Sequence, residues 1–220
     1  MNVALELFAH PLSSYCWKVL IALYENDTPF AYRRIGPDQP ENGAALAAAW
    51  PLGKFPVLLD DARPVVESSI IIEHLQQRHP GAVRFIPADP DAALRVRLLD
   101  RLFDNYVMGQ MQRVVNDALR PPERRDAIEV AEARAALDRA YAWLDPQLAG
   151  CTWAAGDFSL ADCAAAPALF YADWVHAIDP AHAHLRAYRA RLLARPSVAR
   201  AVDEARPYRA LFPLGTPDRD

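Results

Sequence analysis

The amino-acid sequence predicts a small α/β domain followed by a larger domain built only of helices. Short apolar runs alternate with helical patterns up to residue 79. Three prolines and a glycine then interrupt both periodicities within residues 80–90. Beyond that segment, apolar residues recur at spacings of three and four, as in amphipathic helices. We therefore expect one domain at 1–79, a linker at 80–90 and a helical domain at 91–220.

Turn residues and apolar runs define the elements of the first domain. The apolar run after Val3 stops at His10-Pro11, and a serine that follows can cap a helix. Turn-forming residues at 60–64 separate two short apolar runs, which indicates a hairpin. The expected elements are a strand over Val3–Phe8, a helix capped by Ser13 or Ser14, a strand over Pro29–Ile35, a helix over Glu41–Trp50, hairpin strands at Pro56–Leu59 and Val65–Val66, and a helix from about Ser68 to Arg78.

The order of these elements, β-α-β-α-β-β-α, is the order of a thioredoxin-like fold. A strand, a helix and a second strand imply a parallel crossover, whereas a hairpin adds an antiparallel pair. We expect a mixed sheet with helices packed against it.

The helical domain is predicted from its apolar stripes and its caps. One stripe covers residues 99–115 and another covers residues 130–148, with Pro121-Pro122 between them. Ser159 and Asp162 have the spacing of a capping box, which predicts the start of a third helix, and Pro167 should kink that helix. Shorter helices are expected over 180–194 and 197–204.

Composition excludes several classes of protein. The chain has 24 Lys and Arg against 28 Asp and Glu, a formal charge of −4, which gives no electrostatic basis for binding nucleic acid or an anionic membrane. No apolar run approaches the roughly 18 residues of a membrane span, and no secretory signal pattern is present. Cys16, Cys151 and Cys163 are sparse, odd in number and without metal-ligand spacing. We expect a cytoplasmic protein that holds no metal.

Three short segments in fixed order carry the chemistry. Residues 11–19 place hydroxyls at a helix start, residues 53–57 form an X-Pro strand entry, and residues 65–69 place a carboxylate and serines at another helix start. Taken singly, each has an ordinary structural explanation such as capping. Together they supply a hydroxyl, a backbone edge and a carboxylate. These groups are what a protein needs to hold a small acidic peptide and activate its thiol.

This set of segments, with the later motif at residues 156–162, resembles the cytosolic glutathione S-transferases, in particular serine-type bacterial members that are similar to the zeta and theta classes. The resemblance spans nearly the whole chain. It implies a thioredoxin-like domain followed by a helical bundle, a homodimer, and glutathione as cosubstrate without any metal. It also implies an enzyme of detoxification that adds the glutathione thiolate to a small hydrophobic electrophile.

The resemblance assigns the thiol-activating hydroxyl. In serine-type members the acting serine lies three residues before a Cys or Ser and five before an Arg or Lys. Cys16 and Lys18 therefore indicate Ser13, with Ser14 as the second choice and Tyr15 as a weaker rival. Cys16 itself lies one helical turn too late to act as the nucleophile, and we expect a buried, inert thiol there.

The energetics of a thiol support this assignment. A thiol with a pKa near 8.5 is only slightly ionised at neutral pH, and the thiolate is the nucleophile. Lowering the pKa by about two units requires about 2.7 kcal/mol. A hydrogen bond to a charged group supplies about 1.5–3 kcal/mol, and a helix N-terminus adds about 0.3–1 kcal/mol. The two effects together are sufficient.

The resemblance also implies how glutathione is held. Pro56 is expected in the cis form, Val57 would exchange backbone hydrogen bonds with the cysteinyl residue, and Lys54 would pair with the glycine carboxylate. Glu67, in a strained turn, would take the α-amino group, and Ser68 would bind the γ-glutamyl carboxylate. The expected glutathione contacts are Lys54, Phe55, Pro56, Val57, Glu67 and Ser68.

The electrophile is expected between the loop after the first strand and the first long helix of the helical domain. The candidate lining residues are His10, Leu12, Tyr106, Met108, Met111 and Gln112. His10 could act as an acid or base beside the thiol. Two alternatives to transfer remain open: glutathione-dependent cis-trans isomerisation of a maleyl compound, and a non-catalytic interaction protein with the same fold.

Overall fold

A four-stranded mixed sheet organises the first part of the protein. The computed structural model describes residues 5–220, with strands β1 (Leu5–Ala9), β2 (Ala31–Arg34), β3 (Val57–Asp60) and β4 (Arg63–Val66). Their spatial order is β2-β1-β3-β4. β1 pairs parallel with β2, and β3 pairs antiparallel with β1 and β4. The predicted parallel pair and hairpin are both present.

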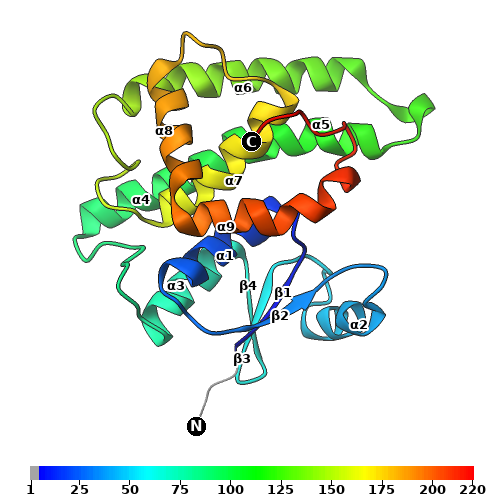
Figure 1. The fold of residues 1–220 in the computed structure, drawn as a ribbon, viewed down its shortest axis with the longest axis vertical. Coiled ribbons are helices and arrows are strands. Elements are labelled where there is room, and N and C mark those ends of the chain that lie inside the picture. Colours follow the sequence, from blue (N-terminus) through cyan, green and yellow to red (C-terminus); the bar gives the residue numbers. More distant parts are fainter. Residues whose placement is uncertain (1–4) are drawn as a thin grey trace.

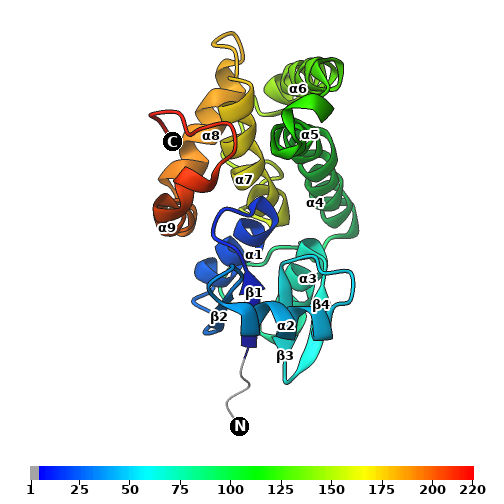
Figure 2. The same cartoon turned by 90° about the vertical axis from the view of Figure 1, so that its right-hand side faces the viewer.

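Three helices accompany the sheet: α1 (Ser14–Glu25), α2 (Pro40–Ala49) and α3 (Ser68–Arg78). All three were expected from the sequence within a few residues. α1 and α3 lie between the sheet and the helical domain, as Figures 1 and 2 show. The strand expected over Val3–Phe8 begins at Leu5 in the described part of the chain, and its first two residues lie outside that part.

Side-chain alternation along β1 explains how the sheet serves two cores. Leu5, Leu7 and Ala9 join the main hydrophobic core, which continues through α1 and α3 into the helical domain. Phe8 points to the opposite face and packs with Leu46 of α2 in a smaller cluster. This period of two is the signature of a strand buried on both faces. The sheet therefore fixes both α1, which starts at the proposed thiol site, and the loop that follows α2.

The second part of the protein is entirely helical. Its elements are α4 (Pro90–Leu102), the π-helical segment η1 (Phe103–Met108), α5 (Gly109–Leu119), the short turn η2 (Pro122–Arg124), α6 (Ala127–Gln147), α7 (Leu160–Val175), α8 (Ala183–Ala194), α9 (Pro196–Ala205) and the 3₁₀ segment η3 (Arg206–Leu211). α7 runs through the middle, with α4, α5 and α6 on one side and α8 and α9 on the other (Figure 2). Within residues 5–220 no helix has the length and apolar character needed to cross a membrane.

The predicted capping box at the start of α7 is present and tightly bonded. Asp162 is fully buried and accepts hydrogen bonds from the Ser159 and Ala154 amides, each at 2.9 Å, and from the Tyr188 hydroxyl at 2.6 Å. Its carboxylate thereby fixes the helix start, the preceding loop and α8. Asp162 is a structural residue, as the sequence indicated.

The predicted fold class is confirmed, with one difference in the first long helix. The apolar stripe predicted a single regular helix across residues 99–115, whereas α4, η1 and α5 follow one another with a π-helical segment in the middle. A π turn closes its hydrogen bonds over five residues instead of four. The side chains of α5 are therefore rotated about the helix axis, relative to those of α4, from the positions that a regular helix would give them.

Candidate active site

Ser13 is the N-cap of α1, and capping uses its hydroxyl oxygen only as an acceptor. The Ser13 backbone is extended, with φ −80° and ψ 120°, and its Oγ accepts a hydrogen bond from the Cys16 amide at 3.4 Å. A hydroxyl can accept and donate at the same time. Capping therefore leaves the Ser13 O–H free to donate to a ligand at the helix mouth, where the helix dipole also favours negative charge. Capping and thiol activation are compatible in one side chain.

Glu67 connects β4 to α3 through a strained backbone. Its φ of 69° and ψ of 119° lie where non-glycine residues are rare, at a cost of about 1–3 kcal/mol. Glu67 is the N-cap of α3 but makes no side-chain capping hydrogen bond, and it is exposed. Ser68, the first residue of α3, is buried. The expected strained turn is confirmed, and it presents a free carboxylate beside a helix N-terminus.

These elements meet around one cavity of about 590 Å³. The Phe55–Pro56 peptide bond at its wall is cis, as expected. The residues that line the cavity are Ser13, Tyr15, Trp50, Gly53, Lys54, Phe55, Pro56, Glu67, Ser68, Arg101, Asp104, Asn105, Gln112 and Asn116. Three segments that are far apart in the sequence thus form one largely polar binding space.

A second cavity of about 340 Å³ adjoins the first and has a more apolar lining. Its walls are His10, Leu12, Ser13, Ser14, Tyr15, Phe55, Met111, Gln112, Val115, Tyr171, Leu211, Phe212 and Pro213. Ser13, Tyr15, Phe55 and Gln112 line both cavities. The free hydroxyl of Ser13 therefore lies at the boundary between a polar space and an apolar one.

Three residues predicted for the site lie elsewhere. Tyr106 is 59 % exposed in a different groove, and Met108 is buried in the hydrophobic core. Both lie in the π-helical segment η1, and neither lines the two cavities, whereas Met111 of α5 lines the smaller one. Val57 is fully buried and lies in the middle of the sheet, opposite Phe8 on one side and Val66 on the other. Phe55, outside the strand, is the residue that faces the cavities.

The titratable groups near Ser13 are held in their neutral forms. Burial raises the pKa of the Cys16 thiol to about 12, which makes it the inert thiol expected from the sequence. Burial, reinforced by Asp104, raises the pKa of the Tyr15 phenol to about 12. Burial and the Arg34 guanidinium lower the pKa of His10, and its Nδ1 accepts a hydrogen bond from the Leu12 amide at 3.1 Å. Tyr15 and His10 can thus donate hydrogen bonds into the second cavity.

A buried charge network beside the site was not predicted. Lys18 is 1 % exposed, and its Nζ donates to Asp104 Oδ2 at 2.8 Å and to Ser69 Oγ at 2.9 Å and forms a salt bridge with Asp100. Arg101, half exposed, contacts the same two carboxylates and lines the polar cavity. The signal in the sequence was that Asp100, Arg101 and Asp104 interrupt the apolar stripe of the first long helix, which indicates that charged groups lie near its buried face.

Family models match most of the chain. A model described as the glutathione S-transferase N-terminal domain matches residues 7–82, and one described as the glutathione S-transferase C-terminal domain matches residues 107–196. The chain belongs to the glutathione S-transferase family. Every segment that forms the polar cavity up to Ser68 lies within the first match.

Individual members of the glutathione S-transferase family are related at modest identity. Glutathione S-transferase GstB of Escherichia coli is 27 % identical over 84 % of this chain and 91 % of its own length. A probable maleylacetoacetate isomerase of Caenorhabditis elegans is 30 % identical over 44 % of this chain. The chain spans about half the length of that isomerase (44 %) and of glutathione S-transferase U10 of Arabidopsis thaliana (51 %).

A solved structure is similar over almost the whole molecule. The glutathione S-transferase of Methylobacterium radiotolerans, in complex with glutathione sulfonate, superposes with a TM-score of 0.79 at 30 % identity. The match covers 90 % of this chain and 94 % of that one. The arrangement of sheet and helices described above is therefore the arrangement of this family.

Proposed function

We propose that the protein is a glutathione transferase that adds the glutathione thiolate to a small hydrophobic electrophile. One observation carries the proposal: Ser13, a hydroxyl donor at a helix N-terminus, lies where the polar cavity meets the apolar one. A peptide thiol in the first cavity and an electrophile in the second would meet there. The bound glutathione sulfonate of the Methylobacterium relative supports the first occupant.

The charges around the polar cavity match those of glutathione. The Glu67 carboxylate would take the α-amino group, while the N-terminus of α3 at Ser68 would take the γ-glutamyl carboxylate. Lys54 is exposed at the rim and would pair with the glycine carboxylate. The Phe55 backbone lies outside the sheet and would pair with the cysteinyl residue.

The chemistry then needs only a thiolate and a nearby carbon. The Ser13 O–H would donate to the sulfur, and the N-terminus of α1 would stabilise its negative charge. A sulfur lone pair forms the new carbon–sulfur bond. In a substitution, a leaving group departs with its electron pair. In an addition to a double bond, the electron pair of that bond moves to the second carbon, which then takes up a proton. The neutral Cys16 thiol takes no part, which favours addition over disulfide exchange.

Glutathione binding should depend on the turn at Glu67. We expect Glu67→Gln and Ser68→Ala each to weaken glutathione binding about tenfold or more, because a hydrogen bond to a charged group is worth about 1.5–3 kcal/mol. Isothermal titration calorimetry and retention on immobilised glutathione would measure this. Glu73→Gln, on the same helix but outside the cavity, is the matched control and should bind normally. No retention of the unaltered protein would instead support a non-catalytic interaction protein.

Isomerisation of a maleyl compound is the second candidate function. It is supported by the Ser13-Ser14 pair and by the similarity to the probable maleylacetoacetate isomerase. The same site would serve, since reversible thiolate addition lets the former double bond rotate before the thiolate leaves. A maleyl compound would be incubated with glutathione and the protein, and its cis and trans forms followed by proton NMR. Conversion of the cis form to the trans form with all glutathione recovered would favour the isomerase, whereas a stable glutathione conjugate would favour the transferase.

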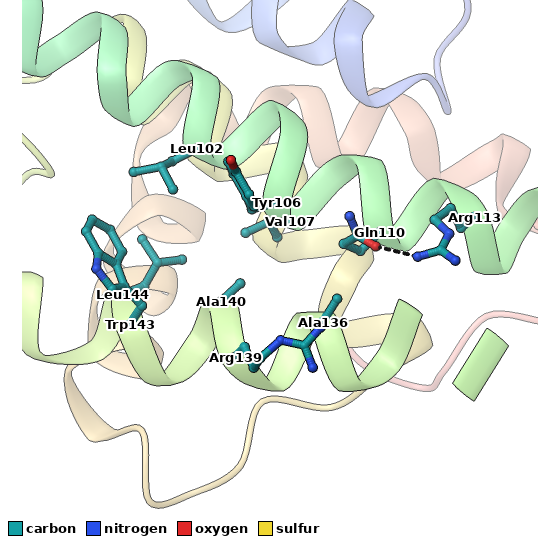
Figure 3. A pocket seen from close by; sticks show the side chains of 10 residues that line it. All are labelled: Leu102, Tyr106, Val107, Gln110, Arg113, Ala136, Arg139, Ala140, Trp143 and Leu144. Atoms are coloured by element: carbon teal, nitrogen blue, oxygen red, sulfur yellow. Dashed lines mark hydrogen bonds between the residues drawn. The ribbon is translucent and has the colours of Figure 1, made fainter. Parts of the chain in front are cut away.

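A homodimer is the assembly that we propose, through an apolar face of the helical domain. Leu94 and Leu98 on α4, Tyr106 on η1 and Trp143 on α6 are all exposed. Tyr106 and Trp143 line a groove of about 530 Å³ between η1 and α6 (Figure 3). Exposed apolar side chains gathered in this way are typical of an interface.

The proposed interface should be sensitive to a charge on the exposed face of α4. We expect Leu98→Glu to convert a dimer to monomers, because a buried unpaired carboxylate is costly. Light scattering coupled to size-exclusion chromatography would measure the mass. Leu119→Glu, which alters another exposed leucine at the far end of α5, is the control and should leave the mass unchanged. A monomeric unaltered protein would refute the proposed assembly.

A further inference from the structure

Two histidines and an aspartate converge at the end of the sheet that lies away from both cavities. Asp60 is the last residue of β3, His74 lies on α3, and His79 is the C-cap of that helix. The Nε2 atoms of His74 and His79 lie 2.6 Å and 2.9 Å from the same Asp60 Oδ2. One potential ligand atom from each residue lies within 4.8 Å of the others. All three side chains are mostly buried but reach solvent.

The spacing of these residues hides the cluster in the sequence. Asp60 is separated from His74 by the β3–β4 hairpin and most of α3, and His74 and His79 are five residues apart. The expectation that the protein has no metal rested on the absence of recognised Cys or His spacing. The fold brings Asp60, His74 and His79 together although they are not close in the sequence.

The donor set suits a divalent transition-metal ion. Two imidazole nitrogens and one carboxylate oxygen are a typical three-residue set for Zn²⁺, with water as the fourth ligand. Metal–ligand distances of about 2.0–2.1 Å place tetrahedral ligand atoms about 3.3 Å apart, so each of the two Nε2–Oδ2 distances needs to lengthen by about half an ångström. The Asp60 carboxylate supplies the anionic oxygen that such a site needs to attract a cation.

We propose that Asp60, His74 and His79 form a binding site for a divalent transition-metal ion such as Zn²⁺. The ion replaces the two Nε2–H···Oδ2 hydrogen bonds, and each neutral imidazole carries its proton on Nδ1 when Nε2 binds the ion. None of the three residues lines either cavity. The site joins the β3–β4 hairpin to the C-terminal end of α3, whose other end carries Ser68, and its role is to fix this helix against the sheet. It is independent of the proposed transferase activity.

Co²⁺ is the probe that tests the site, because tetrahedral Co²⁺ absorbs strongly in the visible region. The titration is done without glutathione or other thiols and in a Cys151→Ser background, since Cys151 is the partly exposed cysteine. We expect one equivalent of Co²⁺ to bind with a tetrahedral spectrum that Zn²⁺ abolishes. His74→Gln and His79→Gln should each weaken binding at least about tenfold. Glutamine retains an N–H that can still donate to Asp60, so these variants preserve the hydrogen bonds of a purely structural cluster.

His176→Gln is the matched control. His176 Nε2 also contacts a carboxylate, Asp138, at 2.6 Å, but within residues 5–220 this pair belongs to no three-residue cluster of possible metal ligands. This variant should bind Co²⁺ as the unaltered protein does. The proposal is overturned if the unaltered protein gives no tetrahedral spectrum, or if the spectrum persists in the double variant His74→Gln/His79→Gln. Either result would leave a hydrogen-bonded clamp as the function of the cluster.

Discussion

Replacing Lys18 with methionine should lower the free energy of unfolding by about 3–5 kcal/mol, the cost of breaking a buried ion pair by removing one partner. Methionine fills most of the volume of the lysine side chain, so the loss of stability comes from removing the charge and not from a cavity. Asp100 and Asp104 are both buried, and each contacts the Lys18 ammonium. Without it, only the half-exposed Arg101 would compensate two carboxylates.

Denaturant unfolding monitored by circular dichroism would measure this effect. Arg97→Met is the control, because Arg97 forms an exposed pair with Glu73, and such pairs contribute at most about 1 kcal/mol. The double variant Lys18→Met/Asp104→Asn should recover part of the loss by removing one of the stranded charges. A decrease below about 1 kcal/mol for Lys18→Met would show that the network is not a stabilising element.

The loss should also depend on pH. Burial raises the pKa of Asp104, whereas Lys18 acts to lower it. Removing Lys18 therefore raises the pKa further above the unfolded value. A carboxyl group with a raised pKa favours the folded state at low pH and loses that contribution as the pH rises through the folded-state pKa. The destabilisation by Lys18→Met should be largest near pH 7 and should shrink as the pH falls toward about 4.

The network also shows what the sequence could and could not predict. Lys18 was used only to locate Ser13 within the resemblance, because its distance from Asp100 and Asp104 along the chain conceals their contact. Local signals performed better: a helix cap at Ser13 or Ser14 depends on neighbouring residues, and Ser13 is the cap. The strained turn at Glu67 was expected from the family resemblance, and it is present.

Predictions that needed a tertiary contact failed. Tyr106 and Met108 were assigned to the electrophile cavity because they belong to the first long helix of the helical domain, but Tyr106 faces a different groove and Met108 faces the core. Asp60, His74 and His79 carry no common spacing, because a hairpin and a helix bring them together.

Ser13→Ala should reduce kcat/KM for the electrophile at saturating glutathione about 25-fold at pH 7, with only a few-fold loss of glutathione affinity. The hydroxyl is expected to lower the thiol pKa by up to about two units, worth about 2.7 kcal/mol, and the γ-glutamyl and glycine contacts lie elsewhere. Loss of the cap would also cost about 1 kcal/mol of stability. Stopped-flow kinetics with a chromogenic electrophile, together with calorimetric binding of glutathione, would separate the two effects.

Two neighbouring substitutions are matched controls for Ser13. Ser14 is buried and lines the smaller cavity but not the polar one. Ser14→Ala should therefore change kcat/KM by less than about threefold. This is much less than the expected effect of removing the hydrogen bond from Ser13 to the thiolate. Tyr15 lines both cavities and keeps its proton, so Tyr15→Phe tests a second hydroxyl at their boundary. A loss of about 25-fold in Tyr15→Phe with full activity in Ser13→Ala would transfer the role to the phenol.

The pH profile decides how the Ser13 hydroxyl acts. If it stabilises the thiolate, the ultraviolet absorbance of the bound thiolate should titrate one to two units higher in Ser13→Ala than in the unaltered protein. The variant should then regain most of its activity near pH 9, where even a free thiol is largely ionised. A loss of equal size at every pH would mean that the hydroxyl positions the sulfur without changing its charge. Since Oγ also caps α1, only the titration distinguishes these two effects.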